Sequence, residues 1–145
     1  MGALTLAPAT VADLLALYAR RGMETPLRDD WHAALVQVLE GPAVSISTRE
    51  GISIGLAGIF YNKGMGEAWL KLAPGAERNL LGLVRILGRL MRGECRRSGL
   101  PILARVQPDN PAGRLLARAA GLTTAELDEG GRQVYRLEVD AWKKP

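Results

Sequence analysis

Residues 107–122, QPDNPAGRLLARAAGL, carry the start and stop signals of a short helix. Asn110 stands at the N-cap position, where its side-chain oxygen can accept from free backbone N–H groups, and Pro111 suits the first helical position. An apolar stripe follows, and Gly121 is placed to end the helix in a left-handed conformation. An apolar run at residues 102–106 comes just before. The pattern predicts a buried strand, an Asn-capped helix and a glycine stop.

The composition limits the class of protein. A chain of 145 residues, 48% hydrophobic, fits a single domain over residues 1–145 that buries its own core. Cys95 is the one cysteine and His32 the one histidine, so we expect no disulfide framework and no metal site built from them. We also expect no signal peptide and no membrane span, and a single cysteine is compatible with a reducing, cytoplasmic compartment. The net charge of +4 allows an acidic partner without requiring one.

Hydrophobic periodicity and turn residues predict the other elements. Thr10 and Asp13 form a capping-box-like helix start, and Gly55 and Gly58 suggest a bulge or a close backbone approach. The predicted strands are 3–7, 43–49, 52–61, 67–72, 102–106, 122–127 and 133–139. The predicted helices run from Thr10 to about Gly22 and over 31–40, 76–98 and 111–120. On helix 76–98 an apolar stripe should face the sheet, and it consists of Leu80, Val84, Leu87, Met91 and Cys95, which favours Cys95 as a small buried hydrophobe. The order is therefore β-α-α-β-β-β-α-β-α-β-β, in a mixed α+β fold.

This order, with the Asn110 helix and Gly121, resembles the GCN5-related N-acetyltransferase (GNAT) superfamily over nearly the whole chain. The resemblance implies that strands 67–72 and 102–106 are parallel neighbours that diverge. It also implies that the pantetheine arm of acetyl-CoA pairs with the first strand, and that the diphosphate sits at the N-terminus of the following helix. The cofactor-binding residues that it implies are Leu70, Leu72, Gly75, Ala76, Arg78, Gly82 and Asn110.

The expected diphosphate loop departs from the family pattern. The family has Arg or Gln, two residues, Gly, one residue, then Gly or Ala, and this motif falls on residues 77–82, ERNLLG. Only Gly82 matches. Leu80 puts a bulky side chain where backbone should approach phosphate, and Glu77 adds negative charge beside a negative ligand. Arg78 remains able to meet a phosphate, so the resemblance implies a weakened acetyl-CoA site.

The expected acid and base also differ. Many members use a Tyr on the Asn-capped helix to protonate the departing thiolate, and Ala117 stands at that position. Glu67 is the candidate general base for the amine, and the alternative is a solvated carboxylate at a strand end. Tyr61 and Tyr135 are candidate acids in principle, and the alternative is a half-buried strand aromatic with its hydroxyl at the rim.

Arginines recur at helical spacing on the predicted helix 76–98. Arg85, Arg89, Arg92 and Arg96 step by 4, 3 and 4, so they share one side of the helix. One interpretation is a solvated face whose long stems cover apolar surface. The other is a docking face for an acidic protein or nucleic acid, because Arg pairs bidentately with carboxylate and phosphate.

Within the family, residues 66–70, GEAWL, and the Arg-rich helix resemble acetyltransferase-like proteins encoded among bacteriophage structural genes. Two hypotheses stay open. The first is a non-catalytic or weakly catalytic GNAT-fold protein with a degenerate active site that works by binding, as a virion component or an assembly factor in a phage particle. The second is an active acetyl-CoA-dependent N-acetyltransferase, an acyltransferase acting on a small amine or a protein amino group.

Overall fold

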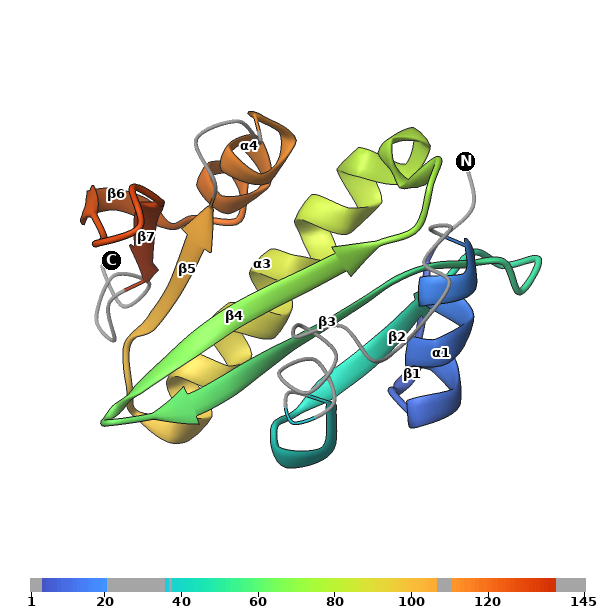
Figure 1. The fold of residues 1–145 in the computed structure, drawn as a ribbon, viewed down its shortest axis with the longest axis horizontal. Helices are drawn as coiled ribbons and strands as arrows, with labels where there is room; N and C mark the ends of the chain where they lie inside the picture. The colour runs from blue at the N-terminus through green and yellow to red at the C-terminus, as the bar shows by residue number, and fades with distance from the viewer. Residues whose placement is uncertain (1–3, 21–35, 37, 107–110, 138–145) are drawn as a thin grey trace. The chain divides into compact units, whose positions relative to one another are not determined.

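The computed structural model describes residues 4–20, 36, 38–106 and 111–137. Their order of strands and helices agrees with the sequence prediction (Figure 1). Val36 and residues 38–40 are helical, and the rest of the predicted helix 31–40 lies outside the described residues. The elements are β1 (Thr5–Pro8), α1 (Val11–Arg20), β2 (Ala43–Ser47), β3 (Ser53–Asn62), β4 (Met65–Leu72), a 3₁₀ helix η1 (Ala76–Asn79), α3 (Leu80–Ser98), β5 (Ile102–Val106), α4 (Pro111–Ala119), β6 (Thr123–Leu127) and β7 (Gln133–Leu137).

The strands form one sheet with both parallel and antiparallel neighbours. Its order is β1-β2-β3-β4-β5-β7-β6. β1 pairs with β2, β2 with β3, β5 with β7 and β6 with β7 in antiparallel fashion, whereas β4 and β5 are parallel. The mixed α+β class is therefore confirmed, including the parallel pair that the GNAT resemblance implied.

The chain forms two compact units. The first contains residues 1–60 and 69–80, and the second contains residues 61–68 and 81–145. The long β3–β4 hairpin contributes residues to both.

In the first unit, α1 starts at the predicted capping box. The Asp13 N–H donates to the Thr10 hydroxyl at 3.1 Å, and the Thr10 N–H donates to a carboxylate oxygen of Asp13 at 2.9 Å. These reciprocal bonds satisfy backbone donors that the first helical turn leaves free. The helix then presents Leu14 and Leu17 to the core.

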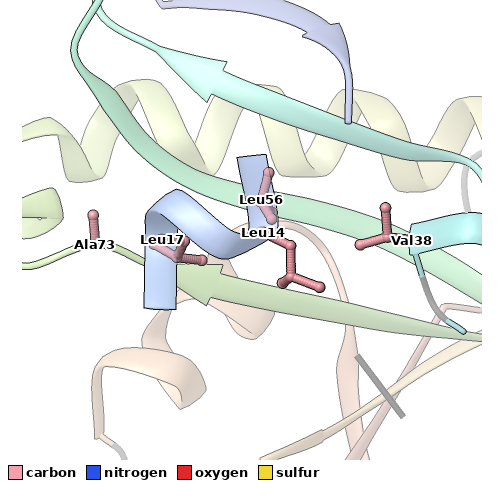
Figure 2. Packing of buried hydrophobic residues seen from close by; sticks show 5 residues of the cluster. All are labelled: Leu14, Leu17, Val38, Leu56 and Ala73. Atoms are coloured by element: carbon pink, nitrogen blue, oxygen red, sulfur yellow. The ribbon is translucent and has the colours of Figure 1, made fainter. Parts of the chain in front are cut away.

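The core of this unit joins α1 to the sheet (Figure 2). Its buried members come from α1, the predicted second helix, β3 and the residue after β4. They are Leu14, Leu17, Val38, Leu56 and Ala73. Leu14 is fully buried, and Leu17 and Leu56 nearly so, and burying a leucine side chain contributes about 1.5–3 kcal/mol. The apolar face of α1 is therefore held by β3.

Gly55 and Gly58 mark close backbone approaches, as the sequence suggested. A Cβ on Gly55 would lie 2.7 Å from the Lys71 carbonyl oxygen. One on Gly58 would lie 2.5 Å from the Pro42 carbonyl oxygen and 2.6 Å from the Trp69 ring. A register shift beside Ile46 and Ser47 also places a bulge in the β2–β3 ladder opposite this stretch.

In the second unit, the β3–β4 turn is tighter than predicted. We expected a loop over 62–66, whereas Lys63 and Gly64 alone separate Asn62 from Met65. Both have positive φ, 52° and 77°, as a type I′ turn requires. The prediction missed this because Lys at the first central position is not among the usual Asn, Asp or Gly.

The buried stripe of α3 is rotated from the predicted one. We expected Leu80 and Val84 in it, and both are only partly buried. Leu83 takes their place and is fully buried, and the stripe continues through Leu87, Met91 and Cys95 at steps of four residues. The burial of Cys95 agrees with its interpretation as a small buried hydrophobe.

The helix α4 ends as the sequence predicted. Gly121 has φ 101°, its N–H donates to the Arg118 carbonyl at 3.0 Å, and the Leu122 N–H donates to the Ala117 carbonyl at 3.0 Å. These two bonds form a Schellman motif, and buried Leu122 supplies its apolar contact. The expected cap, Asn110, lies outside the described residues. Among the described helices, none is long and apolar enough to cross a membrane.

Candidate functional site

The carboxylate of Glu67 is held in an ion pair. It lies on β4 opposite Leu103 of β5 and accepts a hydrogen bond from the guanidinium of Arg105. Both side chains are about one-third exposed, at 36% for Glu67 and 29% for Arg105. The candidate base is therefore neither a free carboxylate nor a merely solvated one, because an arginine engages its oxygen lone pairs.

Arg105 also ties this pair to the β6–β7 turn. Its Nε lies 3.4 Å from Oδ2 of Asp128, and the Arg132 Nε donates to the same oxygen at 2.8 Å. Asp128 Oδ1 accepts from the backbone N–H groups of Gly130 and Arg132 at 3.0 and 2.9 Å. Partial burial works against ionisation of Asp128, but the Arg132 and Gly130 contacts outweigh it and hold the pKa of this carboxyl below its usual value.

β4 and β5 pair in parallel within the second unit. Gly66 lies opposite Ile102, and Glu67 lies opposite Leu103. β4 continues to Leu72, and its residues 69–72 belong to the first unit. Leu70 and Leu72 lie in that part of β4, where the resemblance places the pantetheine-binding backbone.

The segment between β4 and α3 is a filled turn. Pro74 and Gly75 are its central residues, Gly75 has φ 85° and ψ 0°, and the Ala76 N–H donates to the Ala73 carbonyl at 3.2 Å. This is a type II turn, which requires a residue such as Gly at the third position. The Arg78 N–H then donates to the Gly75 carbonyl at 3.2 Å. Two N–H groups expected to face a diphosphate thus already have partners.

The N-terminus of α3, where the resemblance places the diphosphate, carries the side chains that the sequence predicted to obstruct that site. The predicted helix 76–98 begins as the 3₁₀ helix η1, and α3 starts at Leu80. Glu77 and Arg78 are exposed, and Leu80 is partly buried. Gly82 is the third residue of α3 and is partly buried. Ala76 is buried, so its side chain supports the turn.

Neither candidate tyrosine is placed as a free proton donor: Tyr61 is hydrogen-bonded to Glu94, and Tyr135 is buried. The Tyr61 hydroxyl donates to Oε1 of Glu94 at 2.8 Å, and the Arg97 guanidinium lies 5.9 Å from the ring centroid. Burial raises the pKa of Tyr61 above its usual value. A hydrogen bond with Ser98 lowers this pKa, and the contact with the Glu94 carboxylate raises it further. Tyr135 is 3% exposed and lies in β7, more deeply buried than the expected half-buried strand aromatic. Ala117, at the position of the family tyrosine, is 7% exposed.

The arginine face of α3 is exposed as predicted. Its members, Arg85, Arg89, Arg92 and Arg96, all belong to the second unit. A guanidinium nitrogen of Arg92 lies 2.9 Å from the position that a Cβ on Gly88 would take, so this side chain folds back over the helix. The Arg96 side chain is exposed but is not without an interaction partner.

The ion cluster around Arg105 was not predicted from the sequence. Its signal was an arginine inside the apolar run ILARV, because a cation in a largely buried strand requires a carboxylate partner. The Asp128 to Arg132 spacing around a Gly-Gly turn was the second signal. Within residues 4–20, 36, 38–106 and 111–137, no group of three or more His, Cys, Asp or Glu is placed to hold a metal ion.

No protein-family model and no curated protein matches this sequence. Solved structures do match. An acetyltransferase from Agrobacterium tumefaciens is 22% identical, with a TM-score of 0.71 over 93% of this chain and 90% of that chain. A variant of the spermidine N-acetyltransferase SpeG from Vibrio cholerae is 13% identical, with a TM-score of 0.73 over 97% and 96%.

The ribosomal-protein-S18-alanine N-acetyltransferase from Escherichia coli is 17% identical, with a TM-score of 0.66 over 94% of each chain. At these identities the likeness establishes architecture and not activity. Each match spans nearly the full length of both chains, so the shared architecture is that of the whole chain. This protein has the fold of the GNAT acetyltransferases.

Proposed function

We propose that this protein is a GNAT-fold binding protein with little or no acetyl-transfer activity. The observation that carries the proposal is the ion pair between Glu67 and Arg105. A general base must accept the proton of the attacking amine, and it does so through an oxygen lone pair. Here the guanidinium engages that carboxylate, so Glu67 would first have to release Arg105.

Two further features support the same conclusion. Ala117 has no proton to donate to a departing thiolate, and its position is buried. The Ala76 and Arg78 N–H groups donate to carbonyls of their own turn, which leaves fewer donors for a diphosphate. General acid–base catalysis contributes typically 10²–10⁴-fold, so a site without these groups would turn over slowly.

Release of free CoA thiol from acetyl-CoA tests the proposal. We expect no release above background with spermidine, a lysine peptide or an N-terminal alanine peptide as acceptor, and no change in Glu67→Gln. The matched control is Glu129→Gln, an exposed carboxylate on the β6–β7 turn. Turnover that Glu67→Gln lowers at least tenfold while Glu129→Gln leaves it intact would contradict the proposal and establish Glu67 as the base.

The second candidate is an active N-acetyltransferase for a small amine or a protein amino group. The parallel pairing of β4 with β5 and the acetyltransferase neighbours favour it. In that case the amine nitrogen attacks the thioester carbon, the C–S bond breaks, Glu67 takes the amine proton, and solvent protonates the thiolate. Acetyl-CoA would be the cofactor. Saturable stabilisation by acetyl-CoA in a thermal-shift titration would favour this candidate.

The binding role that we propose uses the arginine face of α3. Four exposed arginines on one helix side complement an acidic protein surface, and no aromatic residue is interleaved with them as nucleic-acid platforms usually require. A virion protein or an assembly factor is the kind of partner that the sequence resemblance suggested. The proposed partner is therefore an acidic protein, in a bacterial cell or in a phage particle.

Binding to poly-glutamate at low salt tests this face. We expect the triple variant Arg85→Glu, Arg89→Glu, Arg92→Glu to lose at least tenfold in affinity, while Arg49→Glu, an exposed arginine of the first unit, changes little. Circular dichroism would verify that the fold is intact. Equal losses in both variants would show that only net charge matters, and retained binding in the triple variant would refute the docking face.

A further inference from the structure

A surface hollow of about 460 Å³ lies between α4 and β7 in the second unit. Four of its lining residues share the outer face of α4, at helical steps of three, one and three, and two come from one face of β7. They are Pro111, Arg114, Leu115, Arg118, Gln133 and Tyr135. A volume of this size falls in the range of small-molecule sites.

The hollow is strongly cationic. Arg114 and Arg118 are exposed and stand one helical turn apart, so their guanidinium groups serve the same patch of surface. Within the described part of the chain, neither forms an ion pair with a carboxylate. This distinguishes them from Arg97, Arg105 and Arg132, each of which has a carboxylate partner.

The remaining lining residues add neutral polar and apolar surface. Tyr135 is buried, with 3% of its surface exposed, and its side chain lines the hollow. Its phenol combines an apolar ring with a hydroxyl that can donate a hydrogen bond. Gln133 supplies an amide, and Leu115, which is 52% exposed, supplies an apolar wall. The set suits a ligand with one strongly anionic end and a small apolar body.

We infer that this hollow binds a small organic phosphate monoester. Two guanidinium groups that form no ion pair within the described residues match the nearly double negative charge of such a phosphate at neutral pH, and their planar donor forks match its oxygen geometry. The Tyr135 hydroxyl and the Gln133 amide can donate to further oxygens. Leu115 covers the organic part of the ligand, which inorganic phosphate lacks.

This site shares one residue, Tyr135, with the groups considered for acetyl transfer. Its lining contains neither Glu67, nor Ala117, nor any residue of the turn between β4 and α3. The outer face of α4 is exposed at Arg114, Leu115 and Arg118, whereas Leu116 and Ala117 face the interior. The inference therefore stands whether or not acetyl-CoA binds or reacts.

The test is a titration of the isotopically labelled full chain with phenyl phosphate, followed by two-dimensional amide NMR at pH 7.5. We expect saturable shifts confined to the α4 and β7 amides. The double variant Arg114→Gln, Arg118→Gln should lose at least tenfold in affinity, and Tyr135→Phe about threefold. The control, Arg49→Gln with Lys63→Gln, removes two exposed cations outside α4 and β7 and should leave the affinity unchanged.

Three comparisons complete the test. Affinity should fall several-fold between pH 7.5 and pH 5, because the second phosphate pKa is about 6 and the dianion is lost. Inorganic phosphate should bind more weakly because it does not contact Leu115, and phenylacetate more weakly because it carries a single charge. Absent or scattered shifts, an equal loss in the Arg49→Gln, Lys63→Gln control, or equal affinity for either comparison anion would overturn the inference.

Discussion

Glu94, a partly buried carboxylate in the second unit, is stabilised by hydrogen bonds from two neighbouring side chains. Glu94 accepts from the Tyr61 hydroxyl at 2.8 Å and from two Arg97 nitrogens at 2.9 and 2.7 Å. The Arg97 hydrogen bond holds the pKa of Glu94 below its usual value despite partial burial, which opposes it, and the Tyr61 contact adds to the lowering. An ionised Glu94 thus joins the end of β3 to α3.

The pH dependence of stability follows from that lowered pKa. The unfolded chain takes up the Glu94 proton at a higher pH than the folded chain does, so the contribution is fully present above about pH 5 and is lost as pH falls through the folded pKa. Glu94→Gln should lower stability at pH 7 by about 1 kcal/mol and flatten the acid slope between about pH 5 and 3. Urea unfolding midpoints measured from pH 3 to 7 test this, and an unaltered slope would contradict it.

We expect an added methyl group to have opposite effects on stability at two glycines, Gly58 and Gly93. At Gly58 a Cβ would meet the Pro42 carbonyl oxygen at 2.5 Å and the Trp69 ring at 2.6 Å, so Gly58→Ala should destabilise the fold by about 1–3 kcal/mol. At Gly93, inside α3, a Cβ would meet nothing within 4 Å. Gly93→Ala should therefore stabilise the fold by about 0.5–1 kcal/mol.

Thermal unfolding of both variants beside the parent protein provides the measurement. The sign of the change is the critical observation, because composition and size change equally in the two variants. A stable Gly58→Ala protein would mean that β2, β3 and β4 do not approach as closely as described.

Helix ends were the elements most predictable from sequence, because their signals are local. The Thr10–Asp13 capping box and the Gly121 stop both formed as expected. Their hydrogen bonds join residues three to five positions apart, so the sequence contains both partners of each bond. The bounds of β5, residues 102–106, were likewise predicted because an apolar run ends there at a turn signal.

The capping box yields an element-scale prediction. Thr10→Ala removes the hydroxyl that accepts the Asp13 N–H, and it should destabilise the protein by about 1 kcal/mol. Thr10→Ser keeps the hydroxyl and should cost only a few tenths of a kcal/mol, which makes it the matched control. Equal losses from both substitutions in thermal unfolding would show that the cap does not hold α1.

Other elements depended on information that local patterns do not hold. The 3₁₀ helix before α3 follows from the Pro74–Gly75 turn. Because Gly75 has φ 85°, the Ala76 N–H donates to the Ala73 carbonyl and the Arg78 N–H to the Gly75 carbonyl. The rotated stripe of α3 follows from packing, which selected Leu83 in place of Leu80 and Val84. Periodicity identified the helix, but several phases fit a sequence this rich in leucine.

At the scale of the whole molecule, the fold was more predictable than the candidate site. Element order, parallel pairing of β4 with β5 and the mixed sheet all followed from the chain, since order and hydrophobic pattern restrict the possible topologies. The partner of Glu67 did not, because Arg105 is 38 residues away in sequence. Pairing between distant charges becomes visible only when the strands are placed.

Isothermal titration calorimetry with acetyl-CoA tests the claim that the acetyl-CoA site of the GNAT fold is weakened in this chain. We expect no saturable heat up to about 1 mM acetyl-CoA, which corresponds to a binding free energy weaker than about −4 kcal/mol. The Glu77→Gln, Leu80→Gly variant, which restores two features of the family loop, should bind more tightly than the parent chain. Micromolar binding by the unaltered protein, abolished by Arg78→Glu, would contradict the claim.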